Sequence, residues 1–180
     1  MKIKFFKSVG NIIPILSSLS ICDEQCFVVS YKKLLIALRC LKLHINYQYN
    51  LLSCISGVDL LHSRYRFGVI YDLLSITYNS RIRVKVFINE TTSVDSTVDI
   101  FYNANWWERE IWDLYGIYFN KHPDLRRILT DYGFEGYPMR KDFPLSGYVE
   151  LRYSQNKKRI IVEPLELTQD FRYFNFETPW

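Results

Sequence analysis

The most regular pattern in this chain is the alternation of apolar and charged positions over residues 81–89. Because side chains alternate between the two faces of a strand, it predicts a strand with one face covered and the other exposed to water. Its apolar members are Ile82, Val84, Val86 and Ile88. Further strand-like runs cover residues 25–30, 47–55 and 67–77. A tight turn is expected at residues 78–80, since asparagine tolerates the left-handed conformation that turns require.

Apolar residues at helical spacing predict a helix from Tyr31 to about Leu43, capped by Ser30. Its expected buried stripe consists of Leu34, Leu35, Leu38 and Leu41. Residues 5–16 show a similar spacing, which predicts an amphipathic helix packed on the core or on a neighbouring protein. Pro14 interrupts the apolar stretch of this segment and argues against a secretory signal.

Three shorter helices are expected in the second half of the chain. The first spans about residues 96–102. The second begins at Asn105, carries Glu108 in the position of a capping box and ends at Gly116. Its apolar stripe is Trp107, Ile111, Leu114 and Tyr115. The third spans residues 123–133, with a proline in its first turn and a glycine at its end.

Together these elements predict an α+β fold, an antiparallel sheet of about four strands with helices on one face. An irregular extended C-terminal segment follows, because glycines and prolines recur there every few residues. The expected organisation has four parts. These are an N-terminal helical segment (1–24), an α+β core (25–104), signature helices with an irregular segment (105–148) and an extended partner-docking tail (149–180).

Composition narrows the class of protein. With 180 residues, 48% hydrophobic and 23% charged, the chain fits one compact domain with a tail. The net charge of +4 is modest, and acids interleave with bases, so the basic stripe typical of DNA-binding proteins does not emerge. No run reaches the about 18 apolar residues that a bilayer span needs, so a soluble or peripheral protein is expected. The cysteines lack metal-ligand spacing and are interpreted as buried or incidental thiols; they are Cys22, Cys26, Cys40 and Cys54.

Residues 106–148, called the signature segment below, are dense in acids, arginines, aromatics, glycines and prolines. Glu-Arg-Glu at 108–110 precedes an acid at Asp113, and His-Pro-Asp-Leu-Arg-Arg follows at 122–127. Gly-Tyr-Pro-Met-Arg-Lys-Asp-Phe-Pro occupies 136–144. An array this long with fixed spacings is far more specific than a short motif. It resembles the signature of the 30-kDa subunit family of respiratory complex I, the NADH:ubiquinone oxidoreductase.

The resemblance implies a non-catalytic structural subunit in the hydrophilic arm of complex I, packed against the 49-kDa and 20-kDa types of subunit in the quinone module. Such a subunit supports electron transfer from NADH to ubiquinone, coupled to proton translocation. Flavin, iron–sulfur clusters and quinone are expected in partner subunits, and this chain binds no cofactor or small-molecule substrate. It is expected at the matrix side of the mitochondrial inner membrane, as a peripheral and mitochondrially encoded protein. A chloroplast NDH-type complex or a related membrane hydrogenase is the alternative setting.

No catalytic, cofactor-binding or metal-ligating residue is assigned. The signature residues expected to hold or form an interface are Glu108, Arg109, Glu110, Asp113, His122, Pro123, Arg126, Arg127, Arg140, Lys141 and Asp142. We interpret their charges as forked ion pairs that hold an irregular segment in place, because guanidinium groups grip carboxylates with two hydrogen bonds.

Two interpretations from other classes stay open at this point. The first is an independent hydrolase that uses Glu110, Asp113 and His122, although the signature segment contains no nucleophilic cysteine and no phosphate-binding glycine loop. The second is an RNA-binding adaptor that uses the basic run at residues 157–159 and the aromatic residues of the tail. Aromatic side chains in an unstructured terminus favour a third view, in which a partner surface receives them.

Overall fold

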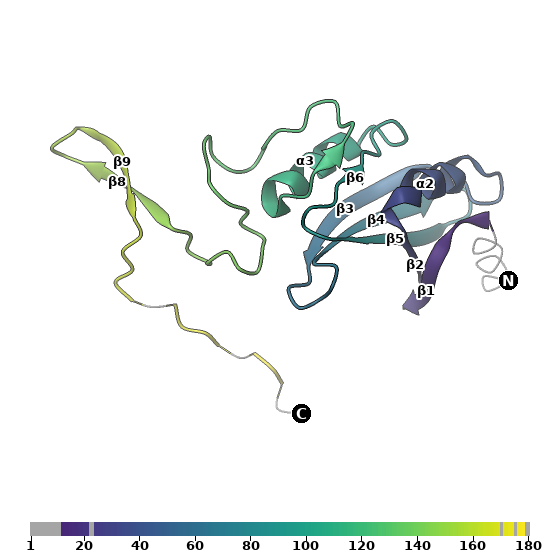
Figure 1. The fold of residues 1–180 in the computed structure, drawn as a ribbon, viewed down its shortest axis with the longest axis horizontal. Helices are drawn as coiled ribbons and strands as arrows, with labels where there is room; N and C mark the ends of the chain where they lie inside the picture. Colours follow the sequence, from purple (N-terminus) through teal and green to yellow (C-terminus); the bar gives the residue numbers. More distant parts are fainter. Residues whose placement is uncertain (1–11, 22–23, 170, 175, 179–180) are drawn as a thin grey trace. The chain divides into compact units, whose positions relative to one another are not determined.

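The computed structural model describes residues 12–21, 24–169, 171–174 and 176–178 (Figure 1). The chain forms two compact units, one that ends at Lys141 and one that begins at Asp142. No helix within the described residues is long and apolar enough to cross a membrane. The predicted four-part division of the chain stays a prediction, and most of its first part lies outside the described residues.

The first unit is built on a five-stranded sheet with the order β1-β2-β5-β4-β3. Its strands are β1 (Ile15–Ile21), β2 (Glu24–Val29), β3 (Leu51–Asp59), β4 (Phe67–Ser75) and β5 (Ser80–Ile88). The pairs β1–β2, β3–β4 and β4–β5 are antiparallel, and β2–β5 is parallel. The predicted α+β class with a mostly antiparallel sheet is therefore confirmed.

The strand predictions differ from the structure mainly at their ends. β4 and β5 lie where the alternation placed them, and Asn79 in the turn between them has the expected left-handed backbone, with φ 43°. β3 begins at Leu51, four residues later than predicted. The preceding residues Tyr47 and Tyr49 are buried in a turn that follows the helix, so their apolar character reflects burial rather than strand pairing.

At the N-terminal side, the structure corrects the end of the helix predicted over residues 5–16. Residues 15–21 form β1, which pairs with β2 along its whole length. The edge of β2 offers backbone hydrogen-bond partners to the serine-rich segment, and serine is a weak helix former. Ile12 is helical, and residues 5–11 of the predicted helix lie outside the described residues.

Two helices pack on the sheet. The short 3₁₀ helix η1 (Tyr31–Lys33) leads into α2 (Leu34–Leu43), which confirms the helix predicted there, although Ser30 makes no side-chain cap bond. α3 (Ala104–Tyr115) lies against β3, where Gly57 leaves room for the ring of Tyr115. A Cβ atom on Gly57 would lie 2.6 Å from that ring.

The core lies on one face of the sheet. The alternate residues Ile82, Val84, Val86 and Ile88 of β5 are buried as predicted, together with Leu34, Ala37, Leu38 and Leu41 of α2. Buried residues of both helices and of the strands β2, β3, β4 and β5 join in one cluster. The other face of the sheet is more exposed to solvent, and on it Arg83 of β5 forms an ion pair with Asp72 of β4. Helices on one face of the sheet are therefore as predicted.

The two other short helices that the sequence predicted are absent from the described chain. Residues 96–102 form turns after β6 (Val94–Asp95), which pairs in parallel with β7 (Phe119–Asn120). Residues 121–141 follow β7 as an irregular loop, called loop 121–141 below, with no helix at 123–133. The proline and glycine signals there mark turns, because side-chain contacts to the backbone replace helical hydrogen bonds.

The second unit contains a hairpin that the sequence analysis missed. Its strands β8 (Val149–Ser154) and β9 (Arg159–Pro164) are antiparallel, and residues 155–158 form the turn between them. The predicted structureless tail is therefore wrong over residues 149–164. Apolar and polar residues alternate in the sequence of β8, whereas β9 carries an apolar run of three residues, Ile160, Ile161 and Val162.

Removal of the hydroxyl of Tyr71 is expected to stabilise the first unit. The Tyr71 ring is buried in the core, and its hydroxyl oxygen has no hydrogen-bond partner among the described residues. Burial of an unpaired hydroxyl is unfavourable, so Tyr71→Phe should raise the free energy of unfolding by about 1 kcal/mol. Thermal unfolding should show a midpoint about 2–4 °C higher. A lower midpoint would reveal a partner for the hydroxyl, such as an ordered water.

Candidate functional site

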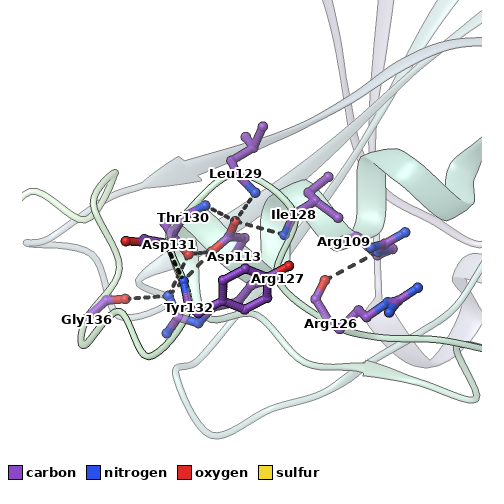
Figure 2. A network of polar contacts seen from close by, with 10 residues as sticks. All are labelled: Arg109, Asp113, Arg126, Arg127, Ile128, Leu129, Thr130, Asp131, Tyr132 and Gly136. Atoms are coloured by element: carbon purple, nitrogen blue, oxygen red, sulfur yellow. Dashed lines mark hydrogen bonds and ion pairs between the residues drawn. The ribbon is translucent and has the colours of Figure 1, made fainter.

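The carboxylate of Asp113 organises the start of loop 121–141. Asp113 lies near the end of α3, and its side chain is fully buried. Its Oδ2 atom accepts hydrogen bonds from the backbone nitrogens of Ile128 (3.2 Å), Leu129 (2.7 Å) and Thr130 (2.9 Å). Figure 2 shows these three nitrogens converging on the carboxylate. One helix side chain therefore fixes three consecutive peptide groups of an irregular segment.

The other carboxylate oxygen of Asp113 is also engaged. Oδ1 accepts from the hydroxyl of Thr130 at 2.5 Å and lies 3.4 Å from Nη1 of Arg127. The same Arg127 nitrogen donates to the carbonyl oxygen of Gly136 at 3.0 Å. Burial by itself would raise the pKa of Asp113, but the hydrogen bonds from Thr130 and its neighbours hold this pKa below its ordinary value. The Asp113 carboxylate is therefore ionised, and donors of loop 121–141 occupy both of its oxygens.

A second buried carboxylate, Glu108, connects α3 to the turn after β6. It accepts from the hydroxyl of Ser96 (2.6 Å) and from the backbone nitrogen and hydroxyl of Thr97 (both 2.7 Å). Burial raises the pKa of Glu108, and these hydrogen bonds together with His122 oppose that rise. The predicted capping-box role of Glu108 is therefore wrong. α3 begins at Ala104, and the side chain of its N-cap residue makes no cap bond.

His122 is a buried structural residue beside Glu108. Its Nδ1 atom accepts from the backbone nitrogen of Asp124 at 3.1 Å, so Nε2 carries the proton. Nε2 lies 3.2 Å from the carbonyl oxygen of Asn105 and 3.9 Å from Oε2 of Glu108. The side chain thereby joins loop 121–141 to the first turn of α3.

Arg140 and Lys141 fix the end of the loop. Arg140 donates to the carbonyl oxygen of Tyr115 at 2.7 Å and pairs with Glu90, and its guanidinium lies 4.5 Å from the ring centroid of Tyr137. The backbone nitrogen of Lys141 donates to Asp59 at 2.9 Å. Arg66 grips the same Asp59 with two hydrogen bonds of 3.0 and 3.1 Å. This forked ion pair joins two residues outside the signature segment, and the expected forked pairs among the signature residues stay a prediction.

The remaining signature residues are exposed or half-buried. Arg126 is exposed and pairs with exposed Asp124 at 3.0 Å. Arg109 donates to the carbonyl oxygen of Arg126, and its guanidinium lies 5.0 Å from the ring of exposed Trp106. Glu110 is half-buried, and Pro123 and Asp142 are exposed. The signature therefore divides into inward anchors and an outward surface.

The hydrolase interpretation needs Glu110, Asp113 and His122 to act together, and the structure does not bring them together. His122 lies against Glu108, and both oxygens of Asp113 are occupied by donors of loop 121–141. Proton transfer from a substrate needs a carboxylate oxygen within hydrogen-bond reach. The observed arrangement suits anchoring of backbone rather than acid–base chemistry.

Sequence analysis did not find the partners that complete these anchors. Ser96 and Thr97 were assigned to a helix, and Asp59 and Glu90 lie far from the signature segment in sequence. In the sequence, Asp59 stands at the end of an apolar strand-like run. Acidic residues are uncommon in buried positions, and Asp59 is buried.

Comparison with known proteins identifies the family. Residues 27–149 match the family described as "Respiratory-chain NADH dehydrogenase, 30 Kd subunit". The chain is 57% identical over 157 residues to "NADH-ubiquinone oxidoreductase subunit 9" of Reclinomonas americana, which covers 87% of this chain and 77% of that protein. It is 47% identical over 182 residues to the protein of the same name from Prototheca wickerhamii, covering 100% of this chain and 95% of that protein. It is also 58% identical over 140 residues to "NADH dehydrogenase [ubiquinone] iron-sulfur protein 3" of Arabidopsis thaliana, covering 78% and 74%.

The plant relative's name mentions iron and sulfur, yet the described donor set does not fit a cluster. Iron–sulfur clusters are commonly held by four cysteine thiolates. In the described part of the chain, Cys26, Cys40 and Cys54 lie on β2, α2 and β3, and no group of three or more metal-ligating side chains is assembled.

A solved structure supports the fold. A chain of the membrane-bound sulfane sulfur reductase, an archaeal respiratory membrane complex, superposes with a TM-score of 0.68 at 23% sequence identity. The match covers 79% of this chain and 85% of that chain. The identity is low, so this likeness concerns the fold alone. From the family match and the relatives, this chain belongs to the 30-kDa subunit family of respiratory-chain NADH dehydrogenase.

Proposed function

We propose that this chain is a non-catalytic structural subunit in the hydrophilic arm of respiratory complex I. The observation that carries the proposal is the division of the signature segment into inward anchors and an outward surface. Contacts of α3 with Leu129, His122 and Arg140 hold loop 121–141 in one shape. Because the loop is already fixed, it loses little conformational entropy when a partner binds its exposed side chains.

The outward side chains have the composition of a protein interface. Seven large side chains of the signature segment are well exposed, namely Trp106, Tyr118, Leu129, Tyr132, Met139, Leu145 and Tyr148. Tryptophan, tyrosine, methionine and arginine are enriched at protein interfaces. Arg109 lies over the ring of Trp106 and donates a hydrogen bond to the carbonyl oxygen of exposed Arg126. Large apolar side chains held rigidly in water are unfavourable unless a partner covers them.

The proposed partners are the 49-kDa and 20-kDa types of subunit in the quinone module, where this chain braces the path from NADH to ubiquinone. Flavin, iron–sulfur clusters and quinone are held by partners in this proposal, and proton translocation takes place elsewhere in the complex. The names of the relatives, which mention ubiquinone, favour a peripheral location at the matrix side of the mitochondrial inner membrane over a chloroplast complex or a membrane hydrogenase.

The proposal is tested with the tagged full-length chain in its native membranes. A mild-detergent extract is resolved on a native gel, which is stained for NADH dehydrogenase activity. Co-migration of the tag with a large NADH-oxidising complex is the expected result. A chain that migrates only as a free monomer, or bound to RNA, would overturn the proposal.

Arg126→Ala is expected to lower the amount of assembled complex without changing the turnover of the complex that remains. The Arg126 side chain is exposed, and its ion pair with Asp124 contributes at most about 1 kcal/mol to folding. An assembly defect would therefore report on contact with a partner. Arg81→Ala, at an exposed arginine of β5, is the control and should assemble normally. Normal assembly of Arg126→Ala with impaired electron transfer would contradict the structural role.

A further inference from the structure

The hairpin of the second unit has one entirely apolar face. Directly opposed residues on the two strands are Val149 and Pro164, Leu151 and Val162, and Tyr153 and Ile160. Because side chains two apart along a strand share a face, these six residues lie on one side of the hairpin, called the apolar hairpin face below. Its five members Val149, Leu151, Tyr153, Ile160 and Val162 are 56% to 67% exposed.

The opposite side of the same hairpin is mostly polar, and Ile161, opposite Arg152, is its one apolar member. It carries Glu150 opposite Glu163 and Ser154 opposite Arg159. Arg152 grips Glu163 through two hydrogen bonds of 2.8 Å, which join the two strands on this side. The hairpin is therefore one-sided, as a strand pair is when one face packs on a core.

The hairpin has no core of its own to cover that face. It is a two-stranded sheet of six residues per strand, and such a hairpin alone is marginally stable in water. Five exposed apolar side chains in one flat patch mark an interaction surface. The hydrophobic gain that stabilises the strand pairing must therefore come from another surface.

We propose that the apolar hairpin face docks on another polypeptide of the complex, at an apolar patch with an acidic rim. The inference rests on the proposed function, which supplies the complex. The acidic rim is inferred from the turn end of the hairpin, where Lys157, Lys158 and Arg159 are exposed. Among the described residues, no carboxylate forms an ion pair with these three side chains. A partner with acidic groups next to its apolar patch would complement the turn and fix the direction of docking.

The backbone of the hairpin favours a protein over a lipid bilayer as the partner. In the part of the chain that the structure describes, β8 and β9 pair only with each other, so each has one edge whose backbone groups are not paired within this sheet. Hydrocarbon cannot satisfy such edges, whereas a protein surface or the water around it can. The aliphatic side chains of the face also differ from the aromatic platforms that stack on RNA bases.

The test compares a double variant on the apolar hairpin face with a single variant on the opposite face of the hairpin. Leu151→Thr combined with Val162→Thr removes apolar contacts from the apolar hairpin face and keeps side chains that suit a strand. Ile161→Thr, on the polar side, is the matched control. We expect the double variant to lower the amount of chain in the NADH-oxidising complex about tenfold or more, and the control to assemble like the original chain.

A photo-reactive side chain at position 153 then identifies what the face touches. In the assembled complex, a cross-link from Tyr153→p-benzoylphenylalanine to another subunit is expected, and the same group at Arg152 should give none to that subunit. A cross-link to the first unit of this chain, to a second copy of it or to lipid would overturn the inference. So would normal assembly of the Leu151→Thr, Val162→Thr variant. If the original chain itself fails to enter the complex, the proposed function fails instead.

Discussion

Asp113→Ala is expected to release loop 121–141 and to abolish most of the assembled complex. The variant leaves the backbone nitrogens of Ile128, Leu129 and Thr130 without their acceptor, and it leaves the Arg127 guanidinium without its carboxylate. Removal of one partner from a buried charged network costs about 3–5 kcal/mol. Urea unfolding of the chain should show this loss, and native gels should show little complex.

Glu135→Ala is the matched control for Asp113→Ala, because Glu135 is an exposed acid of the same loop. It should change neither stability nor assembly beyond about 0.5 kcal/mol. Should both variants behave alike, the buried carboxylate would not be what holds the loop. Protection of the amides of residues 128–130 against hydrogen exchange is the direct readout, since Asp113 binds all three.

The pH dependence of the free energy of unfolding tests whether the negative charge of Asp113 stabilises the folded chain. Its pKa in the folded chain lies below the ordinary value of 3.8, since hydrogen bonds to the ionised form outweigh the effect of burial. The stabilisation is therefore present above about pH 3.8 and is lost as pH falls through the lowered pKa. The free energy of unfolding of Asp113→Ala should therefore fall less on acidification than that of the original chain.

Gly116→Ala is the second change with a large expected effect. Gly116 ends α3 with φ 76°, a conformation that costs an alanine about 1–2 kcal/mol. The added Cβ would also lie 2.7 Å from the ring of Tyr137 and from the guanidinium of Arg140. Displacement of these two side chains would break the contact between Arg140 and the end of α3. The total expected loss of stability is about 2–5 kcal/mol.

Gly133→Ala separates the two causes of that loss. Gly133 has a similar φ of 71°, but a Cβ there would meet no atom within 4 Å. Its substitution should therefore cost only the backbone strain, about 1–2 kcal/mol, and assembly should persist. Equal losses of stability for the two glycine variants in urea unfolding would show that the packing of Tyr137 and Arg140 contributes nothing.

Local patterns in the sequence predicted much of the sheet and its main helix. The alternation over residues 81–89 predicted β5, the helical spacing of leucines predicted α2, and Gly116 predicted the end of α3. These predictions succeed because hydrophobic period and turn chemistry act over a few residues. The family could also be predicted from sequence, because the signature segment fixes many residue types at set spacings.

The roles of the signature residues could not be derived from sequence alone. Glu108 occupies a capping-box position, yet it binds Ser96 and Thr97, since the turn after β6 brings two hydroxyls and a backbone nitrogen to it. Local rules count only neighbours in the chain, and a buried carboxylate binds whichever donors the fold brings near. The predicted helix at 123–133 failed for the same reason, because Asp113 offered its peptide groups another acceptor.

The sequence by itself determined the class of fold, the positions of α2, β4 and β5, and the family. The tertiary structure decided which signature residues face inward, because hydrogen bonds between residues distant in sequence depend on where the chain returns. Asp59 and Lys141 lie 82 residues apart and meet at 2.9 Å. The structure also decided that residues 149–164 pair as a hairpin, since the pairing of two short strands depends on register and on the turn between them.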